Sequence, residues 1–412
     1  GIREKSDTDR TLRWLAWVLS CGAVYLSTGT AYAIKSIHAD APAMGMMVMA
    51  CATVTLAKDS PSLRRLILSA FFAALACFTK QIEVFALPGL FFFLGLAFAW
   101  RSAFLYAGIV SGWAVVLALA FGATMGGLED MLFNIVQVPS LHDWKGPRVS
   151  ILLKSGATMG LAAMFLLLML LPFAGKAFSR RRIGLASTAE VLREHRWTLF
   201  AFVAITMVPG SLMGEVKVGG MDNSYHTLYY LMVALGLAGL GWVADFPDER
   251  RRIALAGVYL MAAIAVGLGG PDLNNLLGVR SIWQNPQQQA YEFAKEHPGE
   301  VLFPWNPLAT LYADGKVYHF EYGIYDRSFA GFPPEKEHFE KHLPEKLNYV
   351  IWRNHRECFQ IPQYLPAFSK RTNVADLSGP LDVPIKVPLF DPMEPPELND
   401  RGIGGWMVLT RE

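Results

Sequence analysis

Long stretches of apolar residues without a charged side chain fill the first two thirds of the chain. Of the 412 residues, 53% are hydrophobic and only 17% are charged, and the mean hydropathy is +0.29. This composition excludes a disordered chain and is unusual for a soluble domain. Because a helix needs about 20 apolar residues to cross roughly 30 Å of hydrocarbon, the pattern predicts a helical membrane protein.

The apolar stretches predict about nine membrane spans. They lie near 12–33, 42–57, 66–79, 83–100, 103–124, 150–174, 197–213, 225–244 and 253–269. The third stretch is short, and it either gains length from Leu63 and a snorkelling Lys80 or stops partway across the membrane. The fold class that we expect is therefore a polytopic α-helical membrane protein.

The composition changes near residue 270, since 16 of the 24 prolines lie in the last 143 residues. We expect a transmembrane domain over 1–269 and a small soluble α/β domain over 270–412. In the second domain four apolar runs predict strands and one segment predicts a helix. The strands are Val301–Phe303, Val317–Phe320, Tyr349–Trp352 and Trp406–Leu409, and the helix is Glu335–His342.

Basic residues in short loops stay on the cytoplasmic side and so give the orientation of the spans. Threaded in order, nine spans place four basic loops on one face, together with residues 1–11. The basic residues are Lys58, Arg64 and Arg65, then Arg101, then Lys176, Arg180, Arg181, Arg182, Arg193 and Arg196, then Arg250, Arg251 and Arg252. The opposite, extracytoplasmic face receives loops 34–41, 80–82, 125–148 and 214–224 and the C-terminal domain.

Charge and cysteine content narrow the function classes further. Lys and Arg number 37 against 35 Asp and Glu, so no charge excess indicates a nucleic-acid partner. Cys21, Cys51 and Cys77 lie in apolar stretches and only Cys358 lies beyond them, which leaves no disulfide framework. The chain begins with Gly-Ile-Arg, and we expect it to be a fragment that lacks its true N-terminus.

Two of the extracytoplasmic loops place ionisable groups at the ends of apolar stretches. Asp40 precedes Pro42 and is either a capping carboxylate or an acid/base group paired with His38. Lys80 and Gln81 interrupt two apolar runs, and either hold a lipid phosphate or lie in a solvated loop.

The other two loops carry clusters of polar side chains. Loop 125–148 ends in His142, Asp143, Trp144, Lys145 and Arg148, which suit contact with a lipid-linked substrate or a plain interfacial helix. Loop 214–224 contains Lys217 and Gly219-Gly220, and Asp222, Asn223, Tyr225 and His226 open the next span, where helix amides favour a phosphate. No P-loop, dinucleotide fingerprint, paired-cysteine zinc motif or HExxH accompanies them.

Three short motifs carry a resemblance to a known family. Ala39-Asp40-Ala41-Pro42-Ala43 opens a small-residue helix, Phe78-Thr79-Lys80-Gln81 opens an apolar pair, and the segment 217–225 enters a late helix. In their order and spacing, over most of 12–245, they resemble bacterial integral-membrane glycosyltransferases of the GT-C fold, in particular the dolichyl-phosphate-mannose-protein mannosyltransferase-like group that includes the aminoarabinose transferases.

The resemblance implies an enzyme of the bacterial inner membrane that moves a sugar from a polyprenyl-phosphate donor to a lipid, glycan or protein acceptor. It implies that Lys80, Gln81, Lys217 and the 222–226 segment bind the donor phosphate and that Asp40 acts as base, through His38 or a bound divalent cation. The family's acidic first loop has no counterpart, so we expect two further spans and that loop upstream of residue 1.

Other interpretations stay open. Tyr322, Tyr325, Asp326 and Arg327 either contact a sugar acceptor or belong to an ordinary domain surface. A transporter or flippase for a lipid-linked or anionic solute also places charges at helix ends, although no inverted repeat is visible. A non-catalytic membrane scaffold whose soluble domain binds a partner is the third possibility.

Overall fold

The computed structural model describes residues 39–57, 60–124, 126–153, 185–217, 222–228, 230–231, 286–353, 358, 360–374, 377 and 406–411. The chain divides into two compact units. The first, here the helical unit, comprises Gly1–Ile135 and Trp144–Asp272, and the second, the C-terminal unit, comprises Val136–Asp143 and Leu273–Glu412.

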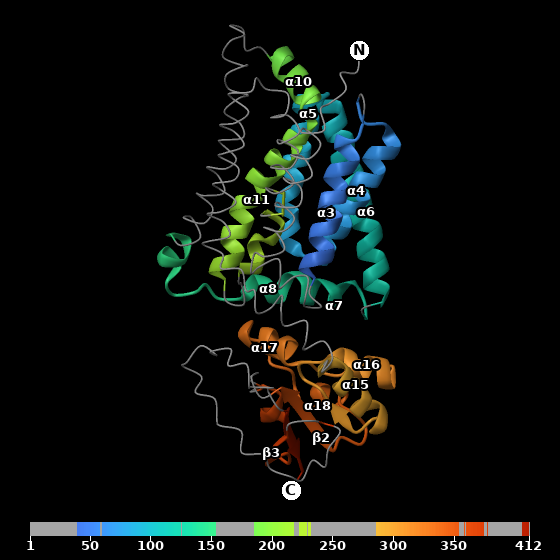
Figure 1. Ribbon diagram of the computed structural model, residues 1–412, viewed down its shortest axis with the longest axis vertical. Coiled ribbons are helices and arrows are strands. Elements are labelled where there is room, and N and C mark those ends of the chain that lie inside the picture. The colour runs from blue at the N-terminus through green and yellow to red at the C-terminus, as the bar shows by residue number, and fades with distance from the viewer. Residues whose placement is uncertain are drawn as a thin grey trace, which may run out of the picture. The chain divides into compact units, whose positions relative to one another are not determined.

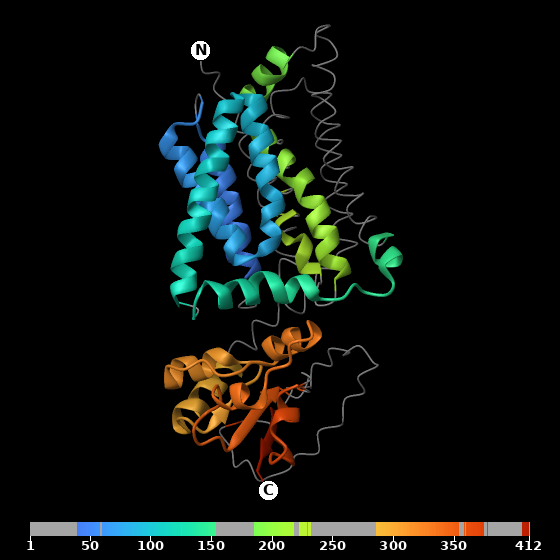
Figure 2. The same ribbon diagram turned by 180° about the vertical axis from the view of Figure 1, so that it is seen from behind.

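The helical unit is built from apolar helices that run side by side (Figures 1 and 2). Its longer elements are α3 (Asp40–Thr55), α4 (Leu63–Thr79), α5 (Leu87–Ala97), α6 (Trp100–Thr124), α10 (Leu185–Glu194) and α11 (Leu199–Val216). Short elements join them: the 3-10 helices η1 (Gln81–Ala86), η3 (Arg196–Thr198) and η4 (Asp222–Tyr225) and the helix α7 (Leu128–Leu132). The π-helical turn η2 (Phe133–Gln137) follows α7, and its last two residues belong to the C-terminal unit. Figure 2 shows α7 lying crosswise at the ends of these helices.

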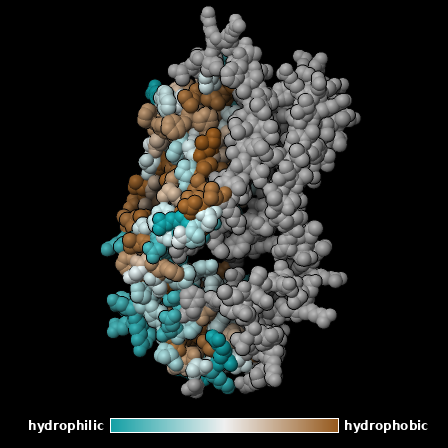
Figure 3. Space-filling model, turned by 90° about the vertical axis from the view of Figure 1, so that its left-hand side faces the viewer, coloured by the Kyte–Doolittle hydropathy of each residue, from teal (hydrophilic) through white to brown (hydrophobic). Residues whose placement is uncertain are grey.

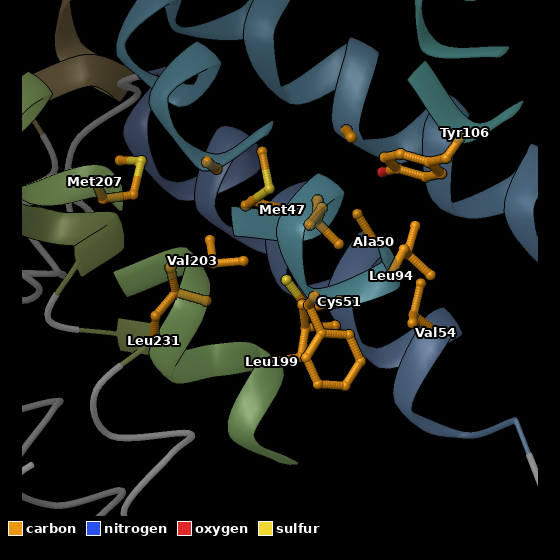
Figure 4. Packing of buried hydrophobic residues seen from close by; sticks show 14 of the residues in the cluster. Met47, Ala50, Cys51, Val54, Leu94, Tyr106, Leu199, Val203, Met207 and Leu231 are labelled. Atoms are coloured by element: carbon orange, nitrogen blue, oxygen red, sulfur yellow. The ribbon is translucent and has the colours of Figure 1, made fainter. Parts of the chain in front are cut away.

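Small residues let these helices approach closely. Ala70, Ala73 and Ala76 of α4 are fully buried, and α4 packs along α3. A Cβ atom at Gly89 of α5 would lie 2.6 Å from the backbone Cα of Val203 in α11, so only glycine permits this contact. Figure 4 shows Met47, Val203 and other side chains of the resulting core pointing toward one another.

The expectation of about nine membrane spans is wrong. The fold is 70% helical, but only two of the described helices are long and apolar enough to cross a bilayer, Trp100–Thr124 and Arg196–Val216. Helices α3 and α4 have 16 and 17 residues, and at about 1.5 Å per residue they reach roughly 24–26 Å, short of the 30 Å of hydrocarbon. The apolar segment Gln81–Ala97 is likewise shorter than a span.

Several of the expected spans lie outside the described residues, namely 12–33, 253–269 and most of 150–174 and 225–244. Apolar side chains are nevertheless prominent on the surface of the helical unit, as the brown atoms of Figure 3 show. Phe104 and Leu119 of α6, for example, are 66% and 61% exposed. The sidedness of the loops stays a prediction.

The C-terminal unit contains a four-stranded sheet in the order β1-β2-β4-β3. The strands are β1 (Val301–Leu302), β2 (Tyr349–Arg353), β3 (Lys370–Val374) and β4 (Trp406–Thr410). Strand β1 pairs parallel with β2, and β4 pairs antiparallel with both β2 and β3. The described helices are α8 (Val138–Leu141), α15 (Pro286–Glu296), α16 (Pro307–Asp314), α17 (Glu321–Phe329) and α18 (Lys336–Glu340), with the 3-10 turn η6 (Ile361–Tyr364).

Side chains that alternate along β2 fill a core on each face of the sheet. Val350 and Trp352 pack with Ile324 of α17 and Phe339 of α18, whereas Ile351 packs with Phe293 of α15 on the other face. Period-two alternation therefore divides one strand between two cores, as expected for a sheet covered by helices on both faces.

Three of the four strand predictions and the helix prediction in this unit are confirmed, with small shifts of their ends. The strand predicted at Val317–Phe320 is wrong, because this segment joins no ladder and Phe320 is instead the N-cap of α17. Strand β3 was not predicted, since its sequence Lys-Arg-Thr-Asn-Val is polar; it comes last in the order of the described strands.

Candidate functional site

A buried carboxylate begins helix α3. Asp40 is the first residue of the helix and is only 1% exposed. The N-cap is Ala39, and no side-chain hydrogen bond caps the helix, so Asp40 is not the capping group that its position suggests. Its negative charge still lies in the first turn, where the helix dipole favours it.

The partner of Asp40 is Lys80, which comes from the far end of α4. Lys80 leaves the helix in an extended conformation, with φ −148° and ψ 117°, and separates α4 from η1. Its Nζ atom forms an ion pair with Oδ1 of Asp40. The Lys80 side chain is 17% exposed while that of Asp40 is fully buried, so the lysine is the member of the pair that reaches the surface.

A histidine completes this cluster from a third element. His226 follows η4, and its Nδ1 atom lies 3.6 Å from Oδ2 of Asp40. The imidazole is 2% exposed, and its Nε2 atom has no hydrogen-bond partner among the described residues. Asp40 is therefore flanked by a cation on one oxygen and an imidazole on the other.

A second buried carboxylate lies on η1, three residues after Lys80. Glu83 is fully buried, and its Oε1 atom accepts a hydrogen bond from the Thr227 hydroxyl. Within the described part of the chain Oε2 of Glu83 has no partner. The Asp40 cluster consists of Asp40, Lys80, Glu83, His226 and Thr227.

Glycines of α11 allow η1 and η4 to approach one another. A Cβ atom at Gly214 would lie 2.6 Å from Oγ of Ser224 and 3.1 Å from Cδ1 of Ile82. One turn earlier, a Cβ atom at Gly210 would lie 2.3 Å from the ring of Phe85. These two glycines let the segments that carry Glu83 and His226 pack against one helix.

A separate group of predicted residues gathers at the end of α11. Trp144 and Lys217 form an isolated antiparallel bridge, and the Lys145 amide donates to the Val216 carbonyl at 2.8 Å. The Lys217 ammonium and the Arg148 guanidinium lie 5.6 and 5.8 Å from the centre of the Trp144 ring. The structure thus joins two loops that the sequence analysis treated separately.

The remaining predicted residues are scattered. Gln81 donates to the Ile135 carbonyl at 3.1 Å, Tyr225 is buried, and Asp143 is exposed. His142 belongs to the C-terminal unit, where its Nε2 atom lies 3.1 Å from the Asp326 carbonyl. His38 and the side chains of Asp222 and Asn223 lie outside the described residues.

Sequence reasoning named Asp40, Lys80 and His226 separately, and it left out Glu83 and Thr227 as site residues. Glu83 carried a signal, because it is a carboxylate at the start of an apolar run. Thr227 carried none, since a threonine at the start of an apolar stretch is ordinary. Within the described ranges there is no group of three or more His, Cys, Asp or Glu side chains arranged to hold a metal ion.

Comparison with known proteins gives no relative for this chain. No family model, no curated protein and no solved structure matches it. Its function has therefore to be argued from the Asp40 cluster itself.

Proposed function

We propose that the chain is a membrane-bound glycosyltransferase that moves a sugar from a polyprenyl-phosphate donor to a hydroxyl group of a lipid, glycan or protein acceptor. The observation that carries this proposal is the buried Asp40 carboxylate with Lys80 on one oxygen and His226 on the other. Such a transfer needs a cation for the phosphate and a carboxylate for the acceptor proton, and the cluster contains both.

Lys80 is suited to the donor phosphate because it is the member of the ion pair that reaches the surface. A donor phosphate attracts the ammonium and so competes with Asp40 for it. As Lys80 turns toward the phosphate, Asp40 loses its counter-charge and becomes a stronger base. Binding of the donor therefore prepares the carboxylate for the second substrate.

In the transfer step the acceptor oxygen attacks the anomeric carbon of the sugar. The bond between that carbon and the phosphate oxygen breaks, and the polyprenyl phosphate leaves with the bonding electrons. The proton of the acceptor hydroxyl passes to Asp40, while Lys80 neutralises the additional charge on the departing phosphate. The His226 imidazole lies 3.6 Å from the other oxygen of Asp40, and the Glu83 carboxyl group is buried close to both charged side chains.

Buried polar atoms without a described partner also support a site over a purely structural ion pair. Oε2 of Glu83 and Nε2 of His226 are both buried and have no hydrogen-bond partner among the described residues. Native proteins leave few such atoms unpaired, because each one costs about 1–3 kcal/mol. A polar substrate provides partners for them.

The test is sugar transfer by the full chain reconstituted into liposomes with a radiolabelled polyprenyl-phosphate sugar. We expect labelled acceptor and free polyprenyl phosphate in equal amounts from the wild type, and neither from Asp40→Asn or Lys80→Ala. Arg64→Ala and Glu129→Gln are matched controls, because both side chains are exposed and lie outside the cluster. Counterflow of the donor without product would contradict the proposal and indicate a transporter.

A further inference from the structure

A polar cavity lies at the end of the helical unit remote from the Asp40 cluster. Its volume is about 630 Å³, and Ser60, Ser102, Glu190, Arg193, Glu194 and Arg196 line it. Ser60 precedes the start of α4, whereas Lys80 follows the end of the same 17-residue helix. Figure 1 likewise shows α10 and α7 at opposite ends of the helices. The cavity is therefore a separate site.

Two arginines give the cavity the chemistry of a phosphate site. The Nε atom of Arg193 donates to the Ala189 carbonyl at 3.2 Å, and that of Arg196 donates to the Arg193 carbonyl at 3.0 Å. These bonds hold the two guanidinium groups by their Nε atoms. Planar, fixed guanidinium groups suit the oxygens of a phosphate, and the two serine hydroxyls add neutral donors.

Two glutamates balance the arginines. Glu190 and Glu194 line the same cavity, and Glu194 also lies 3.9 Å from Nε2 of His195. A ligand with only negative charge would meet repulsion from these carboxylates. A ligand that carries an ammonium group close to its phosphate would instead find a partner for each charge.

An exposed apolar surface starts at the rim of the cavity. Ser102 belongs to the first turn of α6, and its neighbours Trp100, Phe104 and Leu105 are 46%, 66% and 47% exposed. Trp100 packs against Phe91 and Phe92 of α5, so the surface continues onto a second helix. Trp100 therefore lies between a polar cavity and an apolar helix surface. Tryptophan is enriched in this position in membrane proteins, at the boundary between lipid headgroups and acyl chains.

We propose that this cavity binds the headgroup of a phospholipid of the phosphoethanolamine class, with its acyl chains along α6. The phosphate contacts Arg193 and Arg196, the ammonium contacts Glu190 and Glu194, and the hydrocarbon covers the aromatic face around Trp100. This inference does not rest on the proposed transferase function, because it concerns different residues and a different ligand.

The test is native mass spectrometry of the full chain in detergent, with phosphatidylethanolamine and phosphatidylglycerol of equal chain length added in turn. We expect the wild type to retain more phosphatidylethanolamine, and Arg193→Ala/Arg196→Ala to retain about tenfold less or lower still. Arg101→Ala is the matched control, since Arg101 is an exposed arginine of α6 that does not line the cavity.

A second variant tests the proposal through the ammonium contacts, and it can be used if the arginine variant fails to fold. In Glu190→Gln/Glu194→Gln the phosphate contacts remain and the ammonium contacts are lost, so the preference for phosphatidylethanolamine over phosphatidylglycerol should disappear while phospholipid retention persists. A wild type without that preference, or an unchanged preference in this variant, would overturn the proposal. Displacement of the lipid by millimolar inorganic phosphate alone would overturn the role given to the apolar face.

Discussion

The Thr227 hydroxyl donates a hydrogen bond to Oε1 of Glu83 across 144 positions of the sequence. This bond joins η1 to the segment that follows η4, and it lies beside the Asp40–Lys80 ion pair. The geometry of the candidate site therefore depends on contacts between elements that are far apart in the chain.

Removal of the Thr227 hydroxyl should destabilise the helical unit. Thr227→Val leaves a fully buried carboxylate without that donor, which costs about 1–3 kcal/mol. Glu83→Gln should cost less, because the amide oxygen still accepts the bond and no charge remains buried. Thermal unfolding of both variants in detergent checks this order. A midpoint for Thr227→Val equal to that of the wild type would show that the bond contributes nothing.

The Asp40–Lys80 pair should behave as a coupled unit in stability. Either Asp40→Asn or Lys80→Gln leaves the other charge without its counter-ion, and for a buried pair this costs about 3–5 kcal/mol. We expect less at Lys80, since it is partly exposed. The double variant should be more stable than the sum of the two single losses implies. The measurement is the unfolding midpoint of the wild type, the two single variants and the double variant. If the loss in the double variant equals the sum of the two single losses, the two side chains do not interact.

The same double variant distinguishes a loss of activity caused by unfolding from one caused by the missing side chains. If it folds as well as the wild type but transfers no sugar, the loss of activity belongs to the missing groups and not to unfolding.

Close packing between α5 and α11 should make Gly89 irreplaceable. In Gly89→Ala the new methyl group meets the Val203 backbone at 2.6 Å, and such overpacking costs about 1–3 kcal/mol. Gly108→Ala is the control: nothing lies within 4 Å of its added Cβ atom, so the substitution should stabilise α6 by up to about 1 kcal/mol. Opposite shifts in the unfolding temperature are expected, and shifts of equal sign and size would refute the helix contact.

Acid should weaken the C-terminal unit through His319. Burial is the largest of the causes that lower the pKa of this imidazole to about 4; His342 and Arg327 act in the same direction, and the hydrogen bond to the Phe339 carbonyl opposes them. The folded unit therefore binds fewer protons than the unfolded chain, whose histidines have a pKa of about 6.5. The stability that this group contributes is complete above pH 6.5 and is lost as the pH falls toward 4.

The measurement is the unfolding midpoint of the wild type and of His319→Gln at pH 7, 5.5 and 4.5. The wild type should lose stability relative to the variant as the pH falls. A difference that stays constant with pH would show that His319 is protonated equally in both states.

Local patterns in the sequence predicted where most helices and strands lie. They did not predict which helices are long enough to cross a membrane. The apolar runs at 103–124 and 197–213 correspond to α6 and α11, and the runs that became α3 and α4 are helical but too short to span. Composition counts apolar residues and cannot distinguish a helix that faces lipid from one that packs on other helices. Fully buried Ala70 and Ala73 illustrate the second case.

The candidate site could be predicted only in part, because its contacts depend on how the helices pack. Asp40 and Lys80 interrupt apolar runs and were recognised one by one, but their contact depends on the antiparallel packing of α3 and α4. The bond from Thr227 to Glu83 and the meeting of Trp144 with Lys217 depend on tertiary packing alone. In the C-terminal unit, strand β3 was missed because its sequence Lys-Arg-Thr-Asn-Val is polar and does not alternate between apolar and polar residues.

The most direct test of the account is the rate of sugar transfer by Asp40→Asn beside Glu129→Gln in the same liposomes. The account predicts that Asp40→Asn, folded and membrane-bound, forms less than about one hundredth of the wild-type product, because a general base contributes 10²–10⁴-fold. Glu129→Gln should retain the full rate. Near-normal transfer by folded Asp40→Asn would contradict the assignment of Asp40 as the base.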